Sequence, residues 1–223
     1  MCVFACFLIV AYAASLLLVS TDPGVYPRLR LDEEDPLRDY MELVYCRVCN
    51  LRRPPRAAHC YVCNVCVLDH DHHCGVLGGC VGRRSLRWFI LYLMSAAAAA
   101  LMAVVWLFRS LCELSNAARA AHGGGAEAEM HRTPRGQMEG VKPMMVVLLF
   151  VVALVVLMFV GGFCVFQVWL ALTSTTRRES QRREGWYHPV TSPRVLWRNV
   201  LYVVFPPPSL LEAPKSGTSS LLV

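Results

Sequence analysis

Three long apolar blocks, separated by polar segments, dominate the hydrophobic pattern of the chain. A helix of about 20 apolar residues crosses the hydrocarbon core of a bilayer. We therefore expect transmembrane helices over residues 1–21, 86–112 and 143–172. A cleaved signal peptide is the alternative for the first block, but the positively charged start typical of such peptides is absent, which favours a span.

The polar segments predict how these spans are connected. Asp22-Pro23-Gly24 should end the first helix, because proline lacks an amide donor and glycine favours turns. Residues 22–45 then read as a solvated, partly acidic linker. Residues 113–142 contain three consecutive glycines and predict a loose loop between the second and third spans.

The tail, residues 173–223, begins with a basic stretch and ends in a Ser/Gly-rich segment typical of disorder. Its one apolar stretch, residues 194–205, is too short to span a bilayer. We expect this stretch to lie against the membrane or to pack on the cysteine-rich segment at 46–85.

The composition supports a membrane protein and indicates its orientation. Hydrophobic residues make up 56% of the chain, more than a soluble domain of this size carries. The net charge of +6 comes mainly from arginine, which in such a chain indicates orientation and lipid contact, and we expect no nucleic-acid partner. By the positive-inside tendency, segment 22–85 and the tail face the cytosol, whereas loop 113–142 and the N-terminus are lumenal.

Residues 46–85 concentrate the chemistry of the chain. They hold seven of its eleven cysteines, three pairs of which are spaced Cys-x2-Cys, with histidines between them. Thiolate and imidazole suit a tetrahedral zinc site, and the reducing cytosol disfavours the alternative of a disulfide framework. The sequence therefore predicts a metal module between the first and second spans. The seven cysteines are Cys46, Cys49, Cys60, Cys63, Cys66, Cys74 and Cys80.

The ligand count leaves residues for another role. The seven cysteines and four histidines offer eleven donors, whereas two closed tetrahedral sites use eight. Cys74 stands outside the Cys-x2-Cys pairs and directly follows Asp71-His72-His73. A carboxylate, an imidazole and a thiol have the composition of an orienting group, a base and a nucleophile. On spacing alone, a purely structural double-zinc module remains an alternative.

The full pattern resembles the cysteine-rich domain of the DHHC protein S-acyltransferases, or palmitoyltransferases. The residues that carry the resemblance are Cys46-x2-Cys49-x9-His59-Cys60-x2-Cys63-x2-Cys66-x4-Asp71-His72-His73-Cys74-x5-Cys80. Three weaker elements also resemble the family and occur in its order. Asp22-Pro23-Gly24 precedes the cysteine-rich pattern, and Thr175-Thr176 with Glu179 and then Asn199, in the apolar stretch of the tail, come after it.

The resemblance implies a role for each of these positions. One zinc ion would be bound by Cys46, Cys49, His59 and Cys66, and a second by Cys60, Cys63, His73 and Cys80. Cys74 would be the acylated nucleophile, with His72 as its base and Asp71 orienting His72. Thr176 would reach Asp71 from the end of the last span, and Asn199 would be a second supporting residue of the site.

The resemblance also implies the fold and the reaction. We expect an all-α polytopic membrane protein, a transmembrane helix bundle with a small cytosolic double-zinc module between spans. Palmitoyl-CoA would acylate Cys74, and the acyl group would pass to membrane-proximal cysteines of protein substrates at the lipid surface. The expected location is the Golgi or the endoplasmic reticulum, with the plasma membrane as a further option.

The sequence departs from the family pattern at several positions. Family members usually have four spans, and the three expected here correspond to the second, third and fourth. Gly75-Val76-Leu77-Gly78-Gly79 replaces the usual Pro-Trp-x-Asn-Asn, Ser85 stands at a usual asparagine, and one extra residue precedes Glu179. We expect the additional pair Asp69-His70 to be a surface feature. These departures keep open the alternative of a catalytically inactive zinc-module adaptor. A membrane zinc-finger ubiquitin ligase is a second alternative, disfavoured by the ligand order and because such a module gives no role to Cys74.

Overall fold

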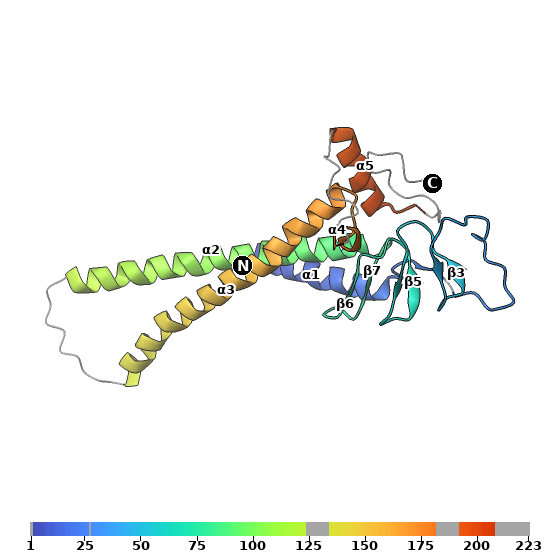
Figure 1. Ribbon diagram of the computed structural model, residues 1–223. Coiled ribbons are helices and arrows are strands. Elements are labelled where there is room, and N and C mark those ends of the chain that lie inside the picture. The colour runs from blue at the N-terminus through green and yellow to red at the C-terminus, as the bar shows by residue number, and fades with distance from the viewer. Residues whose placement is uncertain (1, 27, 124–133, 182–191, 208–223) are drawn as a thin grey trace. The chain divides into compact units, whose positions relative to one another are not determined.

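Three long helices carry the apolar blocks of the sequence (Figure 1). The computed structural model describes residues 2–26, 28–123, 134–181 and 192–207. The long helices are α1 (Cys2–Ser20), α2 (Leu86–Gly123) and α3 (Pro134–Leu172). Within them, segments Cys2–Ser20, Leu86–Ala120 and Pro143–Leu172 are long and apolar enough to cross a membrane.

The second and third helices are longer than the expected spans. We expected a loose loop over 113–142, but α2 continues to Gly123 and α3 begins at Pro134. Alanine has the highest intrinsic helix propensity, so the Ala-rich sequence at 117–121 favours extension of α2. The remaining part of the expected loop, 124–133, lies outside the described residues, as do residues 182–191 and 208–223 of the expected tail, which include its Ser/Gly-rich segment.

The described residues divide into two compact units. One comprises Met1–Ile9 and Leu93–Cys164, and the other Val10–Tyr92 and Val165–Val223. In the first unit, Phe108 of α2 and Phe150 of α3 bring their ring centroids to 6.2 Å. The second unit contains the whole cysteine-rich segment and is the one that carries the site.

The cysteine-rich segment is built from short strands, so the expected all-α class is wrong for this part of the chain. A three-stranded antiparallel sheet has the order β1-β5-β4, and two hairpins pair β2 with β3 and β6 with β7. Each strand is only two or three residues long, so turns make up most of the module. Such a fold is organised around its clustered side chains. The strands are β1 (Val25–Tyr26), β2 (Tyr45–Cys46), β3 (Leu51–Arg52), β4 (Ala58–Cys60), β5 (Val65–Val67), β6 (His72–Cys74) and β7 (Gly79–Val81).

The predicted break after the first helix is present. Asp22 Oδ1 accepts hydrogen bonds from the backbone N–H groups of Gly24 and Val25, at 3.0 and 2.8 Å, and Gly24 has φ +103°. The other carboxylate oxygen of Asp22 lies 2.7 Å from Arg84 Nη1. Asp22 therefore turns the chain from α1 into β1 and ties that turn to the start of α2.

Two short helices follow α3 among the described residues of the second unit. Helix α4 (Arg177–Gln181) follows α3 after a brief turn, and α5 (Pro193–Val204) begins at an N-cap Ser192 with proline in its first turn. The apolar stretch 194–205 thus forms an amphipathic helix. Tyr202 of α5 donates to Asp69 of the cysteine-rich segment, so of the two expected positions, against the membrane or on the module, this contact supports the second.

Candidate functional site

A first cluster of three cysteines and one histidine forms where β4 and β5 meet the β2–β3 hairpin. The side chains are Cys46, Cys49, His59 and Cys66, whose donor atoms all lie within 4.8 Å of one another. His59 Nδ1 is 3.6, 3.4 and 3.9 Å from the three sulfur atoms, in that order of residues. All four residues are buried, which shields the cluster from water.

A second cluster has the same composition and lies beside the β6–β7 hairpin. Cys60, Cys63, His73 and Cys80 bring their donor atoms within 4.8 Å. His73 Nδ1 is 3.7, 3.4 and 3.6 Å from the three sulfurs, and the sulfurs of Cys63 and Cys80 are 3.5 Å apart. The structure thus brings together the same two sets of four that the resemblance implies.

Strand pairing and two tight turns explain how the sequence forms these clusters. His59 lies opposite Cys66 in the β4–β5 pair, and His73 lies opposite Cys80 in the β6–β7 pair. Each remaining pair of ligands is a Cys-x-x-Cys turn followed by an asparagine in the left-handed region, Asn50 and Asn64, both with φ 56°. Asparagine tolerates this conformation better than most residues, so the repeated Cys-x-x-Cys-Asn sequence favours the turn.

The geometry of both clusters fits zinc. In a tetrahedral site with Zn–S and Zn–N bonds of about 2.3 and 2.05 Å, sulfur–nitrogen edges are about 3.6 Å and sulfur–sulfur edges about 3.8 Å. The observed separations of 3.4–3.9 Å lie at these values. Burial and neighbouring thiols raise the pKa of Cys66 and Cys80, so a metal ion must displace their protons to bind.

Cys74 and His72 lie outside both clusters but on the same short strand. Residues two apart on a strand project from the same face, so β6 directs both side chains to one side. His72 Nδ1 is 2.8 Å from Asp71 Oδ2, and its ring contacts Phe89 edge-on at a centroid distance of 5.1 Å. Cys74 is half-buried, so its thiol remains accessible. Strand β6 therefore carries an imidazole that Asp71 orients, two residues before a partly exposed cysteine.

Asp71 is nearly fully buried and accepts three hydrogen bonds. Besides His72, the backbone N–H of Arg177 donates to Oδ1 at 2.6 Å and the side-chain amide of Gln167 donates to Oδ2 at 3.1 Å. Burial alone would raise the pKa of Asp71, but the bonds from His72, Arg177 and Gln167 outweigh it and hold the pKa below its ordinary value. Asp71 is therefore an ionised acceptor that fixes the Nδ1–H tautomer of His72.

The contact implied for Thr176 is made by its neighbour. The Thr176 hydroxyl lies 3.0 Å from Glu179 Oε2 rather than reaching Asp71, and the Thr176 N–H donates to the same oxygen at 2.7 Å. Glu179 N–H donates back to the Thr176 hydroxyl at 3.2 Å. This reciprocal pattern is a capping box, so Thr176 and Glu179 build the first turn of α4, and that turn presents the Arg177 amide to Asp71.

The expectation that Asp69 and His70 form a surface feature is wrong. Both are buried, and Asp69 Oδ2 receives Arg83 Nε at 2.9 Å and the hydroxyl of Tyr202 at 2.5 Å. Burial and Arg178 lower the pKa of His70 to about 4, so this imidazole is neutral at physiological pH. Asp69 thus joins the module to α5 through Tyr202, and His70 is a buried, neutral imidazole.

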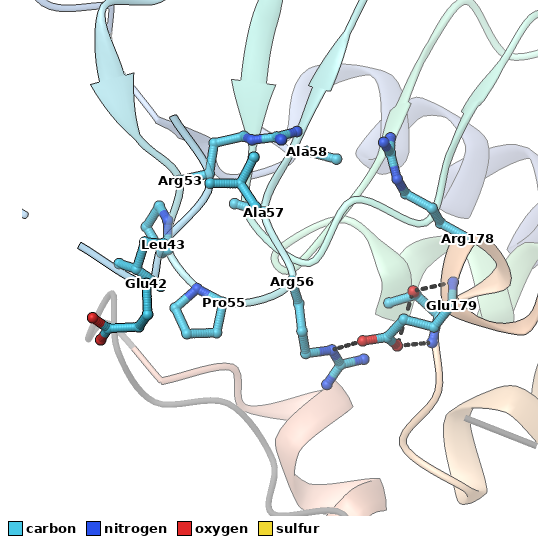
Figure 2. Close-up of a pocket in the computed structure, with 12 residues that line it drawn as sticks. Glu42, Leu43, Arg53, Pro55, Arg56, Ala57, Ala58, Arg178 and Glu179 are labelled. Carbon is cyan, nitrogen blue, oxygen red and sulfur yellow. Dashed lines mark hydrogen bonds and ion pairs between the residues drawn. The ribbon is translucent and has the colours of Figure 1, made fainter. Parts of the chain in front are cut away.

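Two further contacts tie the tail and α4 to the same region. Asn199 is buried and its amide donates to the carbonyl of Leu172 at 2.6 Å, which fastens α5 to the end of α3. Figure 2 shows Arg56 directed toward Glu179, and Arg56 Nε lies 3.2 Å from Glu179 Oε1. This ion pair stands at the edge of a cavity of about 230 Å³, whose basic lining residues are Arg53, Arg56 and Arg178.

A model of the DHHC palmitoyltransferase family matches residues 39–184, well over half of the chain. The chain belongs to this family. The matched range contains both Cys3His clusters, the Asp71–His72 pair and Cys74.

Curated relatives carry the family's name. Palmitoyltransferase ERF2 of Eremothecium gossypii is 29% identical over 127 residues, which cover 48% of this chain and 34% of that protein. Palmitoyltransferase ZDHHC5 of Bos taurus is 41% identical over 90 residues, 34% of this chain and 13% of that protein. Palmitoyltransferase ZDHHC8 of Homo sapiens is 37% identical over 90 residues, 34% of this chain and 12% of that protein. The chain spans about a third or less of these relatives.

Sequence reasoning missed the contacts that several residues make in and around this region. Gln167 appeared as one polar residue in an apolar span, and Arg177 contributes through its backbone, which no side-chain pattern reveals. Ser85, at a departure from the family pattern, is fully buried: its hydroxyl accepts from Gly82 N–H at 3.1 Å and donates to the Cys80 carbonyl at 3.2 Å. The isolated glutamine in a span was the one usable signal among them.

Proposed function

We propose that the chain is a protein S-palmitoyltransferase that carries a long-chain acyl group from acyl-CoA, through a thioester on Cys74, to cysteines of membrane-associated proteins. One arrangement carries this proposal. Asp71 is ionised, accepts three hydrogen bonds and lies beside His72, and Cys74, two residues after His72, is accessible and belongs to neither Cys3His cluster. Family membership supports the same activity.

The proposed chemistry consists of two thioester exchanges. With Nδ1–H bonded to Asp71, His72 has Nε2 free to act as a base. Cys74 gives its proton to this nitrogen and attacks the thioester carbon of acyl-CoA; the carbon–sulfur bond to CoA breaks, and the departing CoA thiolate takes the proton. A substrate cysteine then loses its proton to His72 and attacks acyl-Cys74, whose thiolate leaves and is reprotonated.

Zinc would supply rigidity in this proposal. Cys46, Cys49, His59 and Cys66 would hold one ion, and Cys60, Cys63, His73 and Cys80 the other. His73, a ligand, directly follows the base His72 and precedes the nucleophile, so the second cluster anchors the strand on which both react.

Three helices able to cross a membrane support a multi-pass protein that works at the lipid surface. The proposed orientation, with module and tail in the cytosol and segment 113–142 in the lumen, follows from the arginine distribution. In this orientation, CoA remains in water while the acyl chain lies among the spans. An endomembrane such as the Golgi or the endoplasmic reticulum is the proposed location.

The test is the intact mass of the purified protein after incubation with palmitoyl-CoA, with and without hydroxylamine. We expect one palmitoyl adduct that hydroxylamine removes and that maps to Cys74. Cys74→Ser should abolish the adduct and retain two zinc ions per chain, because Cys74 is not a ligand in either cluster. Cys112→Ser is the matched control, since Cys112 is exposed on α2 outside the module, and should leave the adduct unchanged. Two bound zinc ions without any adduct would favour the inactive adaptor instead.

A further inference from the structure

Gln167 is an unusually placed polar residue. It lies in the last turns of α3, and only 1% of its surface is exposed. A buried amide costs free energy unless it is hydrogen-bonded, and polar side chains within spans are usually retained for function. The neighbours of Gln167 in sequence are apolar, so local structure offers no reason for a glutamine there.

Its partner is the carboxylate of the proposed catalytic pair. Gln167 Nε2 lies 3.1 Å from Asp71 Oδ2, the oxygen that also receives His72 Nδ1 at 2.8 Å. An ionised carboxylate can only accept hydrogen bonds, which determines that the glutamine presents its NH2 group rather than its oxygen to Asp71. The contact joins residues 96 positions apart, so it depends on the folded structure.

The three donors to Asp71 have separate effects on its orientation. The Arg177 amide holds Oδ1, whereas Gln167 and His72 share Oδ2. Without Gln167, the remaining protein donor besides His72 would act on the opposite oxygen, and the carboxylate could rotate about its Cβ–Cγ bond. His72 would then lose the fixed ring orientation on which the proposed proton transfer from Cys74 depends.

We propose that Gln167 is a positioning residue for acyl transfer, which holds the Asp71 carboxylate so that Asp71 in turn orients His72. This inference rests on the proposed function. Gln167 does not touch the reacting atoms and acts only through Asp71.

The experiment compares Gln167→Leu and Gln167→Met with the wild-type chain. Both substitutions remove the donor, and methionine also keeps the approximate length of the side chain. Loss of a hydrogen bond to a charged group predicts a fall of about 10- to 100-fold in kcat for acyl-Cys74 formation in both variants. KM for palmitoyl-CoA and the zinc content should remain at wild-type values, because neither depends on how Asp71 is oriented. Thr173→Val is the control: the Thr173 hydroxyl bonds to carbonyls in the last turn of α3, which Thr173 directly follows, and this variant should acylate at the wild-type rate.

A double-mutant cycle distinguishes positioning from a general structural role. In an Asp71→Ala background, Gln167→Leu should cause no further loss, because its only route to the chemistry has been removed. A further loss of the same size there, a wild-type rate for the single variants, or loss of zinc in both variants would overturn the proposal. If the wild-type chain forms no thioester on Cys74, the proposed function itself fails and this inference fails with it.

Discussion

At the residue scale, environment decides what each side chain does, even where the local sequence repeats. Asp69-His70 and Asp71-His72 are consecutive copies of the same pair, yet Asp69 bonds to Arg83 and Tyr202 while Asp71 bonds to His72, Gln167 and the Arg177 amide. Gly82 is a second residue whose role is set by its surroundings. A Cβ atom there would lie 2.6 Å from both the Pro23 carbonyl oxygen and Val67 Cγ1.

We expect Gly82→Ala to destabilise the module. One of the two closest atoms is a backbone oxygen and the other belongs to the fully buried Val67, so neither can shift at low cost. Overpacking of this kind costs about 1–3 kcal/mol. Gly79→Ala is the control, because no atom lies within 4 Å of its added Cβ. The readout is the temperature at which zinc is released, and equal temperatures for the two variants would refute the packing argument.

At the scale of elements, short segments far apart in sequence support one another around the site. The capping box of α4 presents the Arg177 amide to Asp71, and α5 is fastened by Asn199 to the end of α3 and by Tyr202 to Asp69. Helix α5 is amphipathic, and its contacts with the module explain why an apolar stretch too short to span a membrane is nevertheless ordered.

Tyr202→Phe tests the docking of α5. Removal of the hydroxyl leaves the buried Asp69 carboxylate with one strong donor fewer, at a cost of about 1–3 kcal/mol. We expect faster proteolytic cleavage within α5 and slower acylation of Cys74. Tyr61→Phe is the matched control, because Tyr61 is 87% exposed. Cleavage rates that are the same for both variants would show that the Tyr202 hydroxyl does not hold α5.

At the scale of the whole molecule, the metal clusters are also the hydrophobic core of the module. The buried clusters of side chains contain the ligand cysteines themselves: Cys46, Cys49 and Cys66 pack with Tyr26, Leu51 and Leu68, and Cys60 and Cys80 pack with Val67. A core this small provides little stability without metal, so zinc binding and folding should be coupled.

Cys60→Ala should therefore lose the second zinc ion and expose the β6–β7 hairpin to protease. Cys74→Ala, a substitution of the same type fourteen residues away in sequence, should keep both ions, because Cys74 belongs to neither cluster. Zinc content per chain and the rate of limited proteolysis measure both effects. Retention of two ions and of protease resistance by Cys60→Ala would contradict the ligand assignment.

The sequence alone determined the features that depend on spacing and composition. Apolar runs predicted the segments able to span a membrane, because the length of a span depends only on bilayer thickness. The repeated Cys-x-x-Cys spacing and the resemblance built on it predicted which eight residues would gather, because a tight turn and a strand pair bring ligands together locally.

The tertiary structure alone decided how the Asp71–His72 pair is held and which Asp-His pair is buried for packing. Gln167 and Arg177 reach Asp71 across 96 and 106 positions, and Tyr202 reaches Asp69 across 133. Such contacts leave no periodic trace in sequence, and one of them uses a backbone amide that every non-proline residue possesses. Burial and hydrogen bonding at these positions arise only when α3, α4 and α5 close around the module, and that packing made Asp71 an oriented acceptor and Asp69 a structural one.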